Sequence, residues 1–539
     1  MVKILSILYI SILIPQNFIY DSEDWYIVKD PGAIYSITEG PFKVYFGTEN
    51  GIFSYDVLED VIQYDFQLNR GLTHSEQIFS IHYDNYSDQI WIVTNNGIFY
   101  KNVIFDTFNK VNLKNYDIYQ SYNFGRLGSI DKYLIIENGS EYVFIDSFSG
   151  SQVPSPSEFN IDNVIWSTSF YNYNMNDIDL SKYYSDNWLI GFRTITDSYG
   201  NEESVNVYFE DSHFNLWFGT NNGKLIRGYK YSNKVDIYSI GPFSEGITSL
   251  ARTGEGEWFM SSGRFKRYGG NEYFRYNKQS NPFLSIWNEY DNIWALLNED
   301  DFAELNNPDV NYTYLIEGNY LALGLMEGLL IVPLNNYKNY YFIDKNKGLS
   351  DSAVFKIEHH NDKVFAMTVE GISVYSLSLN LIIEKNILDN YSLEDSGILD
   401  MTVSGNKLYF STKSGLYLYD IEDQNIIKIT DSIFYQIEHK NNKIYGLNHY
   451  FSIIDASSYD ETVFYYDTAR NFEVTDRYIW FNLQDKVKLV DLESKEEWTY
   501  DHNDGFNDIE IFDILDDGDW VCFLTSNGLM FYNWSSYHY

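Results

Sequence analysis

One pattern of apolar and polar positions recurs along most of the chain. A run of apolar residues ends in a polar pair with glycine, and a second apolar run follows at once. The segment Asn215-Leu216-Trp217-Phe218-Gly219-Thr220-Asn221-Asn222-Gly223 is a clear copy, and others are centred on Phe46, Trp91, Phe410 and Phe523. Two aromatic, β-rich runs joined by a glycine-containing tight turn predict a β-hairpin.

Weaker copies keep the order of an aromatic or apolar strand followed by a turn. They contain Tyr133-Leu134-Ile135-Ile136, Trp258-Phe259-Met260, Ile293-Trp294-Ala295-Leu296, Leu321-Ala322-Leu323-Gly324, Val364-Phe365-Ala366-Met367, Ile444-Tyr445-Gly446-Leu447 and Ile479-Trp480-Phe481-Asn482. The units number about a dozen at spacings of roughly 35 to 45 residues, which is typical of propeller blades. The motif decays over residues 102–188, where we expect either a degenerate blade or an insertion, with a long loop over 172–187.

The fold class is therefore predicted to be all-β, a β-propeller of about 12–13 four-stranded blades. Because a ring usually holds about four to eight blades, we expect two rings of about six or seven blades in the region 21–539, with the boundary between them open. The segment 25–29 resembles the outer strand Glu497-Trp498-Thr499-Tyr500. We expect it to supply the fourth strand of the last blade, residues 507–533, which would close a ring and cover an edge strand.

The N-terminus suggests export. Met1-Val2-Lys3 precedes a largely apolar run from Ile4 to Ile14, which is too short to span a bilayer. Residues 1–20 are therefore predicted to be a secretory signal peptide, with a buried first strand as the alternative. The expected location is extracytoplasmic, periplasmic or secreted, with no membrane insertion after signal removal.

Charge narrows the classes of partner. The chain has 77 Asp and Glu against 37 Lys and Arg, a formal net charge of −40. Such a surface repels nucleic acid and anionic lipid, so neither is an expected partner. The high net charge is also typical of a well-solvated, soluble exterior. The expected partner is an unidentified protein or glycan.

No motif identifies a catalytic, cofactor or metal site. The chain has no glycine-rich phosphate loop and no Gly-x-Ser-x-Gly nucleophile elbow. His359-His360 lacks the i, i+4 spacing of a helical zinc site and is expected in an exposed turn. Asp516-Asp517-Gly518-Asp519 is expected in a hairpin turn, because it lacks the calcium-loop ligand pattern. The other acidic cluster is Glu299-Asp300-Asp301.

We therefore assign no catalytic residues, metal or cofactor from the sequence, and the ligand-binding residues stay unknown. Cys522 is the one cysteine, so no intrachain disulfide can form, and its apolar strand predicts that it is buried. The repeated tryptophans are expected to pack between blades. Aromatic residues outside the repeat are better candidates for ligand contact, namely Trp166, Tyr171 and Tyr173.

The complete repeat order resembles a known family. Gly-Leu is followed by an Ile/Val-x-x-Ile strand, as in Gly348-Leu349 before Val354, and then by the Trp-Phe-Gly-Thr-x-x-Gly hairpin. This order is similar to the two-component regulator propeller repeat, most clearly around Phe46, Trp217, Phe410 and Phe523. The resemblance spans Trp25 to Tyr539. It implies seven-bladed propellers, often in tandem, that serve as extracytoplasmic sensors of hybrid histidine kinases.

Nothing resembling a kinase or membrane helix follows the last copy before Tyr539, so we expect a stand-alone exported protein. The expected function is that of a non-enzymatic, sensor-like binding module that recognises a glycan, peptide or envelope partner. The alternative is a propeller-fold polysaccharide lyase or glycosidase, because 77 carboxylates offer many pairs whose separation the sequence does not give.

Overall fold

The computed structural model describes residues 24–535 except 73–75, 106, 114–123, 139–140, 158, 170–178, 199, 244–245, 263–283, 292, 298–300, 303–304, 306–308, 392, 394–396, 466–468, 484–485, 502–503, 505 and 507–508. Their regular secondary structure is almost entirely β-strand, with a few short helical turns, so the all-β class is confirmed. The proposed signal segment 1–20, Tyr171 and Tyr173 lie outside the described residues. So do residues 172–178 of the loop expected over 172–187.

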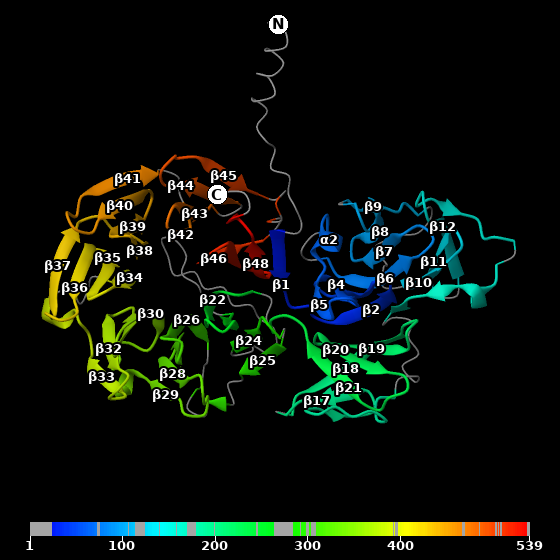
Figure 1. Ribbon diagram of the computed structural model, residues 1–539, viewed down its shortest axis with the longest axis horizontal. Helices are drawn as coiled ribbons and strands as arrows, with labels where there is room; N and C mark the ends of the chain where they lie inside the picture. The colour runs from blue at the N-terminus through cyan, green and yellow to red at the C-terminus, as the bar shows by residue number, and fades with distance from the viewer. Residues whose placement is uncertain are drawn as a thin grey trace, which may run out of the picture.

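The described strands form eleven antiparallel sheets in two groups, seen side by side in Figure 1. The larger group has seven four-stranded sheets. Six of them use consecutive strands: β22 (Ser249–Arg252), β23 (Glu257–Ser261), β24 (Leu284–Asn288), β25 (Ile293–Leu297); β26 (Val310–Ile316), β27 (Tyr320–Leu325), β28 (Leu329–Pro333), β29 (Tyr341–Ile343); β30 (Val354–His360), β31 (Lys363–Thr368), β32 (Ile372–Ser376), β33 (Leu381–Glu384); β34 (Ile398–Ser404), β35 (Lys407–Thr412), β36 (Gly415–Asp420), β37 (Asn425–Thr430); β38 (Gln436–Lys440), β39 (Lys443–Leu447), β40 (Phe451–Asp455), β41 (Glu461–Tyr465); and β42 (Asn471–Val474), β43 (Tyr478–Asn482), β44 (Val487–Asp491), β45 (Glu497–Tyr500).

The seventh sheet joins the two ends of the described chain. Its order is β1 (Trp25–Val28), β48 (Gly528–Tyr532), β47 (Trp520–Thr525) and β46 (Ile511–Asp517). Strand β1 runs antiparallel to β48, with Trp25 opposite Tyr532 and Val28 opposite Leu529. The segment predicted over 25–29 therefore does lie beside the last strand, where it covers the edge of that sheet.

The smaller group has four sheets. They are β2 (Ile34–Glu39), β3 (Lys43–Thr48), β4 (Gly51–Asp56), β5 (Val61–Tyr64) with β15 (Thr168–Ser169); β6 (Ile78–Asp84), β7 (Gln89–Thr94), β8 (Gly97–Asn102), β9 (Asn109–Lys110); β10 (Phe124–Ile130), β11 (Tyr133–Asn138), β12 (Glu141–Asp146), β13 (Gln152–Val153) with β14 (Ile165–Trp166); and β16 (Leu189–Ile190), β17 (Thr194–Thr196), β18 (Glu202–Glu210), β19 (Asn215–Thr220), β20 (Lys224–Tyr229), β21 (Val235–Ser239). Short helical turns occur at α2 (Phe66–Asn69), η3 (Ile161–Asn163), η7 (Lys345–Lys347) and η8 (Asp389–Tyr391).

The sheets of the larger group follow one another around a common centre. Each first strand contacts the first strand of the next sheet, from β22 through β26, β30, β34, β38 and β42 to β46. Figure 1 shows these first strands nearest the centre and the fourth strands on the outside. The Ile247 N–H donates to the Thr525 carbonyl at 3.0 Å, so the beginning of this group lies against its last sheet. The interpretation of this arrangement as a propeller stays a prediction.

The repeated Thr-x-x-Gly motif has a direct structural cause. In the first hairpin the Thr48 hydroxyl donates to the Gly51 carbonyl at 2.9 Å and accepts the Asn50 N–H at 3.2 Å. The glycine takes a positive φ of 118°, which side chains disfavour. Thr412–Gly415 and Thr525–Gly528 repeat the hydroxyl–carbonyl bond. The motif thus closes the turn between the second and third strands of a sheet.

The count of eleven sheets corrects the expectation of about 12–13 blades, and the smaller group has four described sheets instead of six or seven. Two copies of the pattern, around Trp258 and Trp294, belong to one sheet as its second and fourth strands, β23 and β25. The Trp294 ring stacks on Trp287 of β24 with centroids 5.5 Å apart. An outer strand with a cross-strand aromatic pair therefore imitated a hairpin core.

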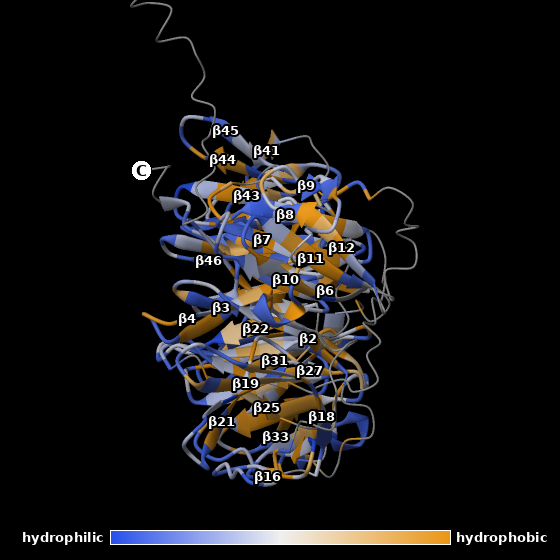
Figure 2. Ribbon diagram, turned by 90° about the vertical axis from the view of Figure 1, so that its right-hand side faces the viewer, coloured by the Kyte–Doolittle hydropathy of each residue, from blue (hydrophilic) through white to orange (hydrophobic). Residues whose placement is uncertain are grey.

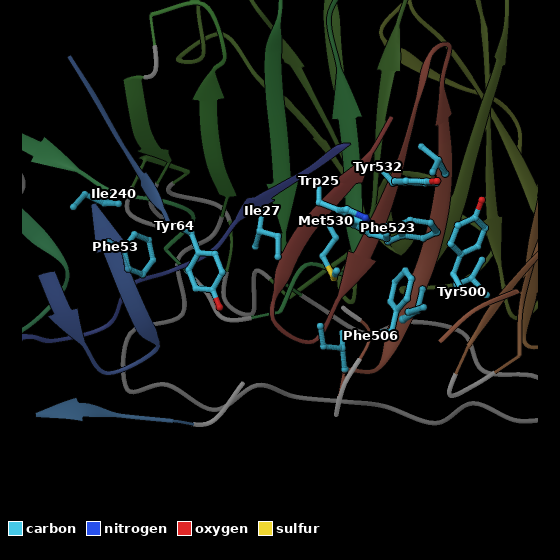
Figure 3. Close-up of a cluster of buried hydrophobic side chains, with 14 of the residues drawn as sticks. Trp25, Ile27, Phe53, Tyr64, Ile240, Tyr500, Phe506, Phe523, Met530 and Tyr532 are labelled. Atoms are coloured by element: carbon cyan, nitrogen blue, oxygen red, sulfur yellow. The ribbon is translucent and has the colours of Figure 1, made fainter. Parts of the chain in front are cut away.

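One hydrophobic core connects the two groups (Figure 3). It contains Trp25 and Phe523 from the sheet that joins the chain ends, and Phe53 and Tyr64 from the first sheet of the smaller group. The Trp25 and Phe506 rings meet edge to face at 5.5 Å. Figure 2 shows orange, hydrophobic stretches within many strands and blue, hydrophilic stretches in many of the turns between them, as half-buried sheets require.

Candidate functional site

Two features of the described residues are candidates for function, and the first lies on the innermost strands of the larger group. Charged side chains stand there at alternating positions of strands that are otherwise largely apolar. This inner-strand charge cluster consists of Lys356 and Glu358 on β30, Asp400 on β34, Glu438 and Lys440 on β38, Glu473 on β42, and Asp513 and Asp516 on β46.

Three carboxylates of this cluster bind the backbone of the next sheet. The acceptor and donor pairs are Asp400 Oδ2 with the Ile437 N–H at 2.8 Å, Glu438 Oε2 with the Val474 N–H at 3.2 Å, and Glu473 Oε1 with the Asp516 N–H at 3.3 Å. An innermost strand has a free edge, and its buried N–H groups need acceptors. These carboxylates therefore join neighbouring sheets.

Lysines partly neutralise the cluster. Lys356 Nζ lies 3.0 Å from Asp400 Oδ1, and Lys440 Nζ lies 3.7 Å from Asp516 Oδ2. Burial alone would lower the pKa of Lys356, but its neighbours, Asp400 first and then Tyr312 and Glu358, together outweigh burial and the pKa is raised. Lys356 is thus held in its charged form.

The remaining carboxyl groups take up protons more readily than usual. Burial raises the pKa of Glu358 and of Glu438 to about 7 each, and that of Asp513 to about 6. The pKa of Glu473 is raised well above its ordinary value, first by burial and then by the Glu438 charge. The cluster can therefore carry protons near neutral pH, and its hydrogen bonds assign it a role in joining the sheets.

The second candidate is a surface of the smaller group. Large apolar side chains are exposed at the β2–β3, β4–β5, β6–β7, β8–β9, β12–β13, β18–β19 and β20–β21 turns and at the end of β20 beside the last of them. We call this the apolar turn face; its residues are Phe42, Val57, Leu58, Tyr86, Ile104, Phe105, Phe148, Phe214, Tyr229 and Tyr231. Leu58 is 80% exposed, Ile104 77% and Tyr231 70%.

Contacts between side chains place these turns at one end of neighbouring sheets. The Ser212 N–H donates to Glu39 Oε2 at 2.8 Å, which joins the β18–β19 turn to the end of β2. The Tyr86 and Phe148 rings lie 5.6 Å apart and join the β6–β7 and β12–β13 turns. In the last sheet of the smaller group Tyr231 contacts the rings of Phe214 and Tyr229 at 5.6 and 5.5 Å. The face is therefore shared by all four sheets.

The larger group is an internal control, because it repeats the same turns. There the large exposed apolar residues in the corresponding turns are Tyr290 and Leu379, and those at the strand ends beside them are Ile293, Tyr341 and Leu381, within the described residues. Most of the other positions are Gly, Asn, Asp or Ser, such as Asn361-Asp362 and Asn441-Asn442. Exposed apolar turns are thus not a requirement of the repeat.

The aromatic candidates from the sequence have structural partners. Trp166 pairs in β14 with β10, and the Arg126 guanidinium lies 4.3 Å from the centre of its ring. Of the repeated tryptophans, Trp91, Trp217 and Trp480 are fully buried, which confirms their packing role. Trp294 and Trp520 are partly buried.

The histidine pair corrects one expectation. His359 and His360 are the last residues of the innermost strand β30 and not part of an exposed turn. His359 Nδ1 lies 3.1 Å from the Tyr314 hydroxyl, and His360 Nε2 lies 2.9 Å from Asn361 Nδ2. The strand extends further than expected because its last residues pair with Val364 and Lys363 of β31.

Of the acidic segment 516–519, Asp516 and Asp517 end strand β46, and Gly518-Asp519 form the expected hairpin turn before β47. Asp517 forms an ion pair with Arg252 of the first sheet of the group. Of the other acidic cluster, Glu299 and Asp300 lie outside the described residues. Among the residues that the structure does describe, no three His, Cys, Asp or Glu side chains are placed to hold a metal ion. Cys522 is buried, as predicted.

The sequence reasoning missed both candidate sites. The sequence does contain a sign of the inner-strand charge cluster. In Phe355-Lys356 and Ile437-Glu438 a charged residue follows an apolar one inside a predicted strand. The apolar turn face also has a sign in the sequence, because Phe42, Leu58 and Phe105 occupy turns that are mostly polar in the other copies of the repeat. Neither signal resembles a known catalytic motif.

Comparisons with known proteins complete the description. Within the described residues no helix is long and apolar enough to cross a membrane. No family model matches the sequence, and no curated protein matches it.

Solved structures do resemble the fold. The extracellular domain of the hybrid two component system BT3049 from B. thetaiotaomicron is 14% identical, with a TM-score of 0.42, over 94% of this chain and 83% of that one. The corresponding domain of BT4673 is 14% identical, with a TM-score of 0.37, over 94% of this chain and 77% of that one. PorZ, a bacterial surface component of the type-IX secretion system of Porphyromonas gingivalis, is 10% identical, with a TM-score of 0.50, over 95% of this chain and 87% of that one. At 10% identity the similarity to PorZ is one of fold alone.

Proposed function

We propose that this chain is an exported, non-enzymatic binding module, a tandem β-propeller of the two-component regulator type that contacts its partner through the apolar turn face. The observation that carries the proposal is the exposure of large apolar side chains at equivalent turns of four neighbouring sheets. A surface of this kind is stable in water only at a cost and is typical of a site for a partner. Loops on a rigid sheet scaffold are also where binding sites commonly lie.

The inner-strand charge cluster supports the non-enzymatic part. Three of its carboxylates accept hydrogen bonds from backbone N–H groups of the next sheet, so these oxygens serve to join neighbouring sheets. A propeller lyase or glycosidase would instead need a pair of carboxyl groups facing a bound sugar.

Cross-linking in the native cell tests the proposal. A photo-reactive amino acid replaces Leu58, and in a second strain it replaces Leu379, an exposed leucine in the corresponding turn of the β30–β33 sheet. We expect a discrete cross-linked product from position 58 in the extracytoplasmic fraction and none from position 379. Equal products from both positions, or a protein confined to the cytosol, would contradict it.

A polysaccharide panel tests the absence of catalysis. The purified protein is incubated with neutral and acidic polysaccharides, and new reducing ends and unsaturated products are measured. We expect no turnover. Turnover that is lost when one carboxylate pair is replaced by amides would establish the lyase or glycosidase alternative.

A further inference from the structure

The chemistry of the apolar turn face identifies the kind of partner it fits, an inference that rests on the proposed function. The face mixes aliphatic and aromatic side chains. Val57, Leu58 and Ile104 offer only dispersion and hydrophobic contact, whereas a sugar is recognised by stacking on flat rings and by hydrogen bonds. Leu58 and Ile104 are among the most exposed residues of the face, at 80% and 77%. An apolar surface of a polypeptide matches this mixture better than a glycan does.

The turns of the face are acidic. They and the strand ends beside them hold Glu39, Asp56, Glu59, Asp60, Asp84, Asp88, Asp131, Asp146, Glu210 and Asp211, against Lys43, Lys132, Lys230 and Lys234, within the described residues. Three of these lysines form ion pairs within the protein, Lys43 with Asp65, Lys230 with Glu210 and Lys234 with Asp186. Of the carboxylates, Asp60 is paired with Arg227. The face therefore presents apolar side chains in a field of negative charge.

That charge excludes two other occupants. A second copy of this chain carries the same acidic turns and the same net charge of −40, so the two faces would repel. A membrane with anionic lipids is repelled for the same reason. A basic partner is attracted, because complementary potentials favour encounter and fix orientation.

We infer that the apolar turn face binds a polypeptide segment or protein surface that combines Lys or Arg with large apolar side chains. The apolar side chains of the partner cover Leu58, Ile104 and the Tyr229–Tyr231 rings. Its cations lie near the carboxylates of the turns, such as Glu59 and Asp88. Binding of this kind weakens as salt screens the charges, while the apolar contact persists.

Peptide selection tests the inference. A phage-displayed library of random linear peptides is selected against the purified protein, and selected peptides are measured in solution. Three proteins are compared: the native chain, the double variant Leu58→Ser with Ile104→Ser, and the control Leu379→Ser. The replaced side chains are all exposed, so the variants are expected to fold, which thermal unfolding verifies.

We expect selected peptides enriched in Lys or Arg together with Leu, Phe or Trp. Their affinity is expected to fall by about tenfold or more for the double variant, to stay unchanged for Leu379→Ser, and to fall with added salt. Peptides without excess positive charge, or affinity that is equal for all three proteins, would overturn the inference.

Two further measurements separate the other occupants. Binding to phosphatidylcholine vesicles, or to an oligosaccharide array, that depends on Leu58 and Ile104 would assign the face to lipid or to glycan and would also overturn the inference. A cross-link from position 58 in cells together with a failed peptide selection would leave the proposed function standing and reject only the basic, apolar polypeptide. If neither the cross-link from position 58 nor any selected peptide is obtained, the proposed function and this inference are both rejected.

Discussion

The Trp25 ring, at the beginning of the first described strand, stacks on Tyr532 in the last strand with centroids 4.6 Å apart. The same two residues are opposite each other in the β1–β48 register. Trp25 also packs against Phe506 and Phe523 in the core that connects the two groups of sheets. Contacts this distant in sequence gain stability only after a very long loop has closed, so they are formed at a high entropic cost.

Replacement of Trp25 by alanine should therefore weaken the whole larger group. The side chain is buried, and truncation of a buried tryptophan costs about 3–5 kcal/mol. We expect a lower melting temperature for Trp25→Ala by differential scanning calorimetry. Trp498→Ala is the matched control, since Trp498 lies on outer strand β45 and is only partly buried. A melting temperature no lower for Trp25→Ala than for Trp498→Ala would contradict the expectation.

Deletion of residues 22–31 tests the strand itself. It exposes the edge of β48, whose backbone Trp25–Val28 otherwise pairs. An uncovered edge promotes association between molecules. We expect earlier elution in size-exclusion chromatography in addition to a lower melting temperature. A deletion variant that elutes and melts like the chain from Ser22 onward would refute this role for β1.

The crossing of two connections makes a third stability prediction. Residues 29–33 and 240–243 both lie between sheets of the two groups, and a Cβ at Gly241 would overlap the Lys29 carbonyl oxygen. Gly241 has a φ of 72°, and Gly405 has a φ of 55° with open space around its Cβ position. Alanine costs about 1–2 kcal/mol at either site because of the left-handed backbone.

Only Gly241→Ala adds the steric overlap, of about 3 kcal/mol, so its melting temperature should fall well below that of Gly405→Ala. Equal melting temperatures for the two variants would show that the connections can separate without cost.

The sequence predicted the strands better than their grouping. Apolar alternation and the Thr-x-x-Gly turn are local, and hairpins such as β3–β4 around Phe46 follow directly from them. The number of sheets depended on whether Trp294 belongs to a hairpin or to an outer strand. That choice is made by its pairing with Trp287, and no local pattern distinguishes the two.

The two candidate sites could not be predicted from the sequence for a related reason. Asp400 and Ile437 are brought together by the packing of neighbouring sheets, which the hydrophobic pattern leaves open. Exposure of Leu58 and Ile104 likewise appears only once the turns are placed, because an apolar residue in a sequence is expected to be buried. The pairing of Trp25 with Tyr532 was accessible, since the segment 25–29 has the pattern of an outer strand.

The single cysteine reports on the integrity of the last sheet. Cys522 is fully buried in β47, and burial raises the pKa of its thiol well above the ordinary value. A buried, protonated thiol reacts slowly with disulfide reagents. We expect slow labelling by Ellman's reagent in the native protein and fast labelling in guanidinium chloride. The control variant Cys522→Ser with Leu379→Cys should label quickly when folded, and fast labelling of native Cys522 would contradict its burial.

The raised pKa values of the inner-strand charge cluster predict that stability depends on pH. Glu358 and Glu438 titrate near pH 7 in the folded protein, whereas an unfolded Glu titrates near about 4.3. Between these values the folded state binds more protons than the unfolded state, so stability falls as pH rises, by at most about 1.4 kcal/mol per pH unit for each group. We expect the melting temperature to fall from pH 5.5 to pH 7.5 and then to level off.

The double variant Glu438→Gln with Glu473→Gln keeps acceptors for the Val474 and Asp516 N–H groups and removes two of the titrations, so its melting temperature should depend less on pH. The surface variant Glu59→Gln is the control and should follow the native curve. A melting temperature that rises over this range, or a double variant with an unchanged slope, would show that these carboxyl groups are ionised in the folded protein.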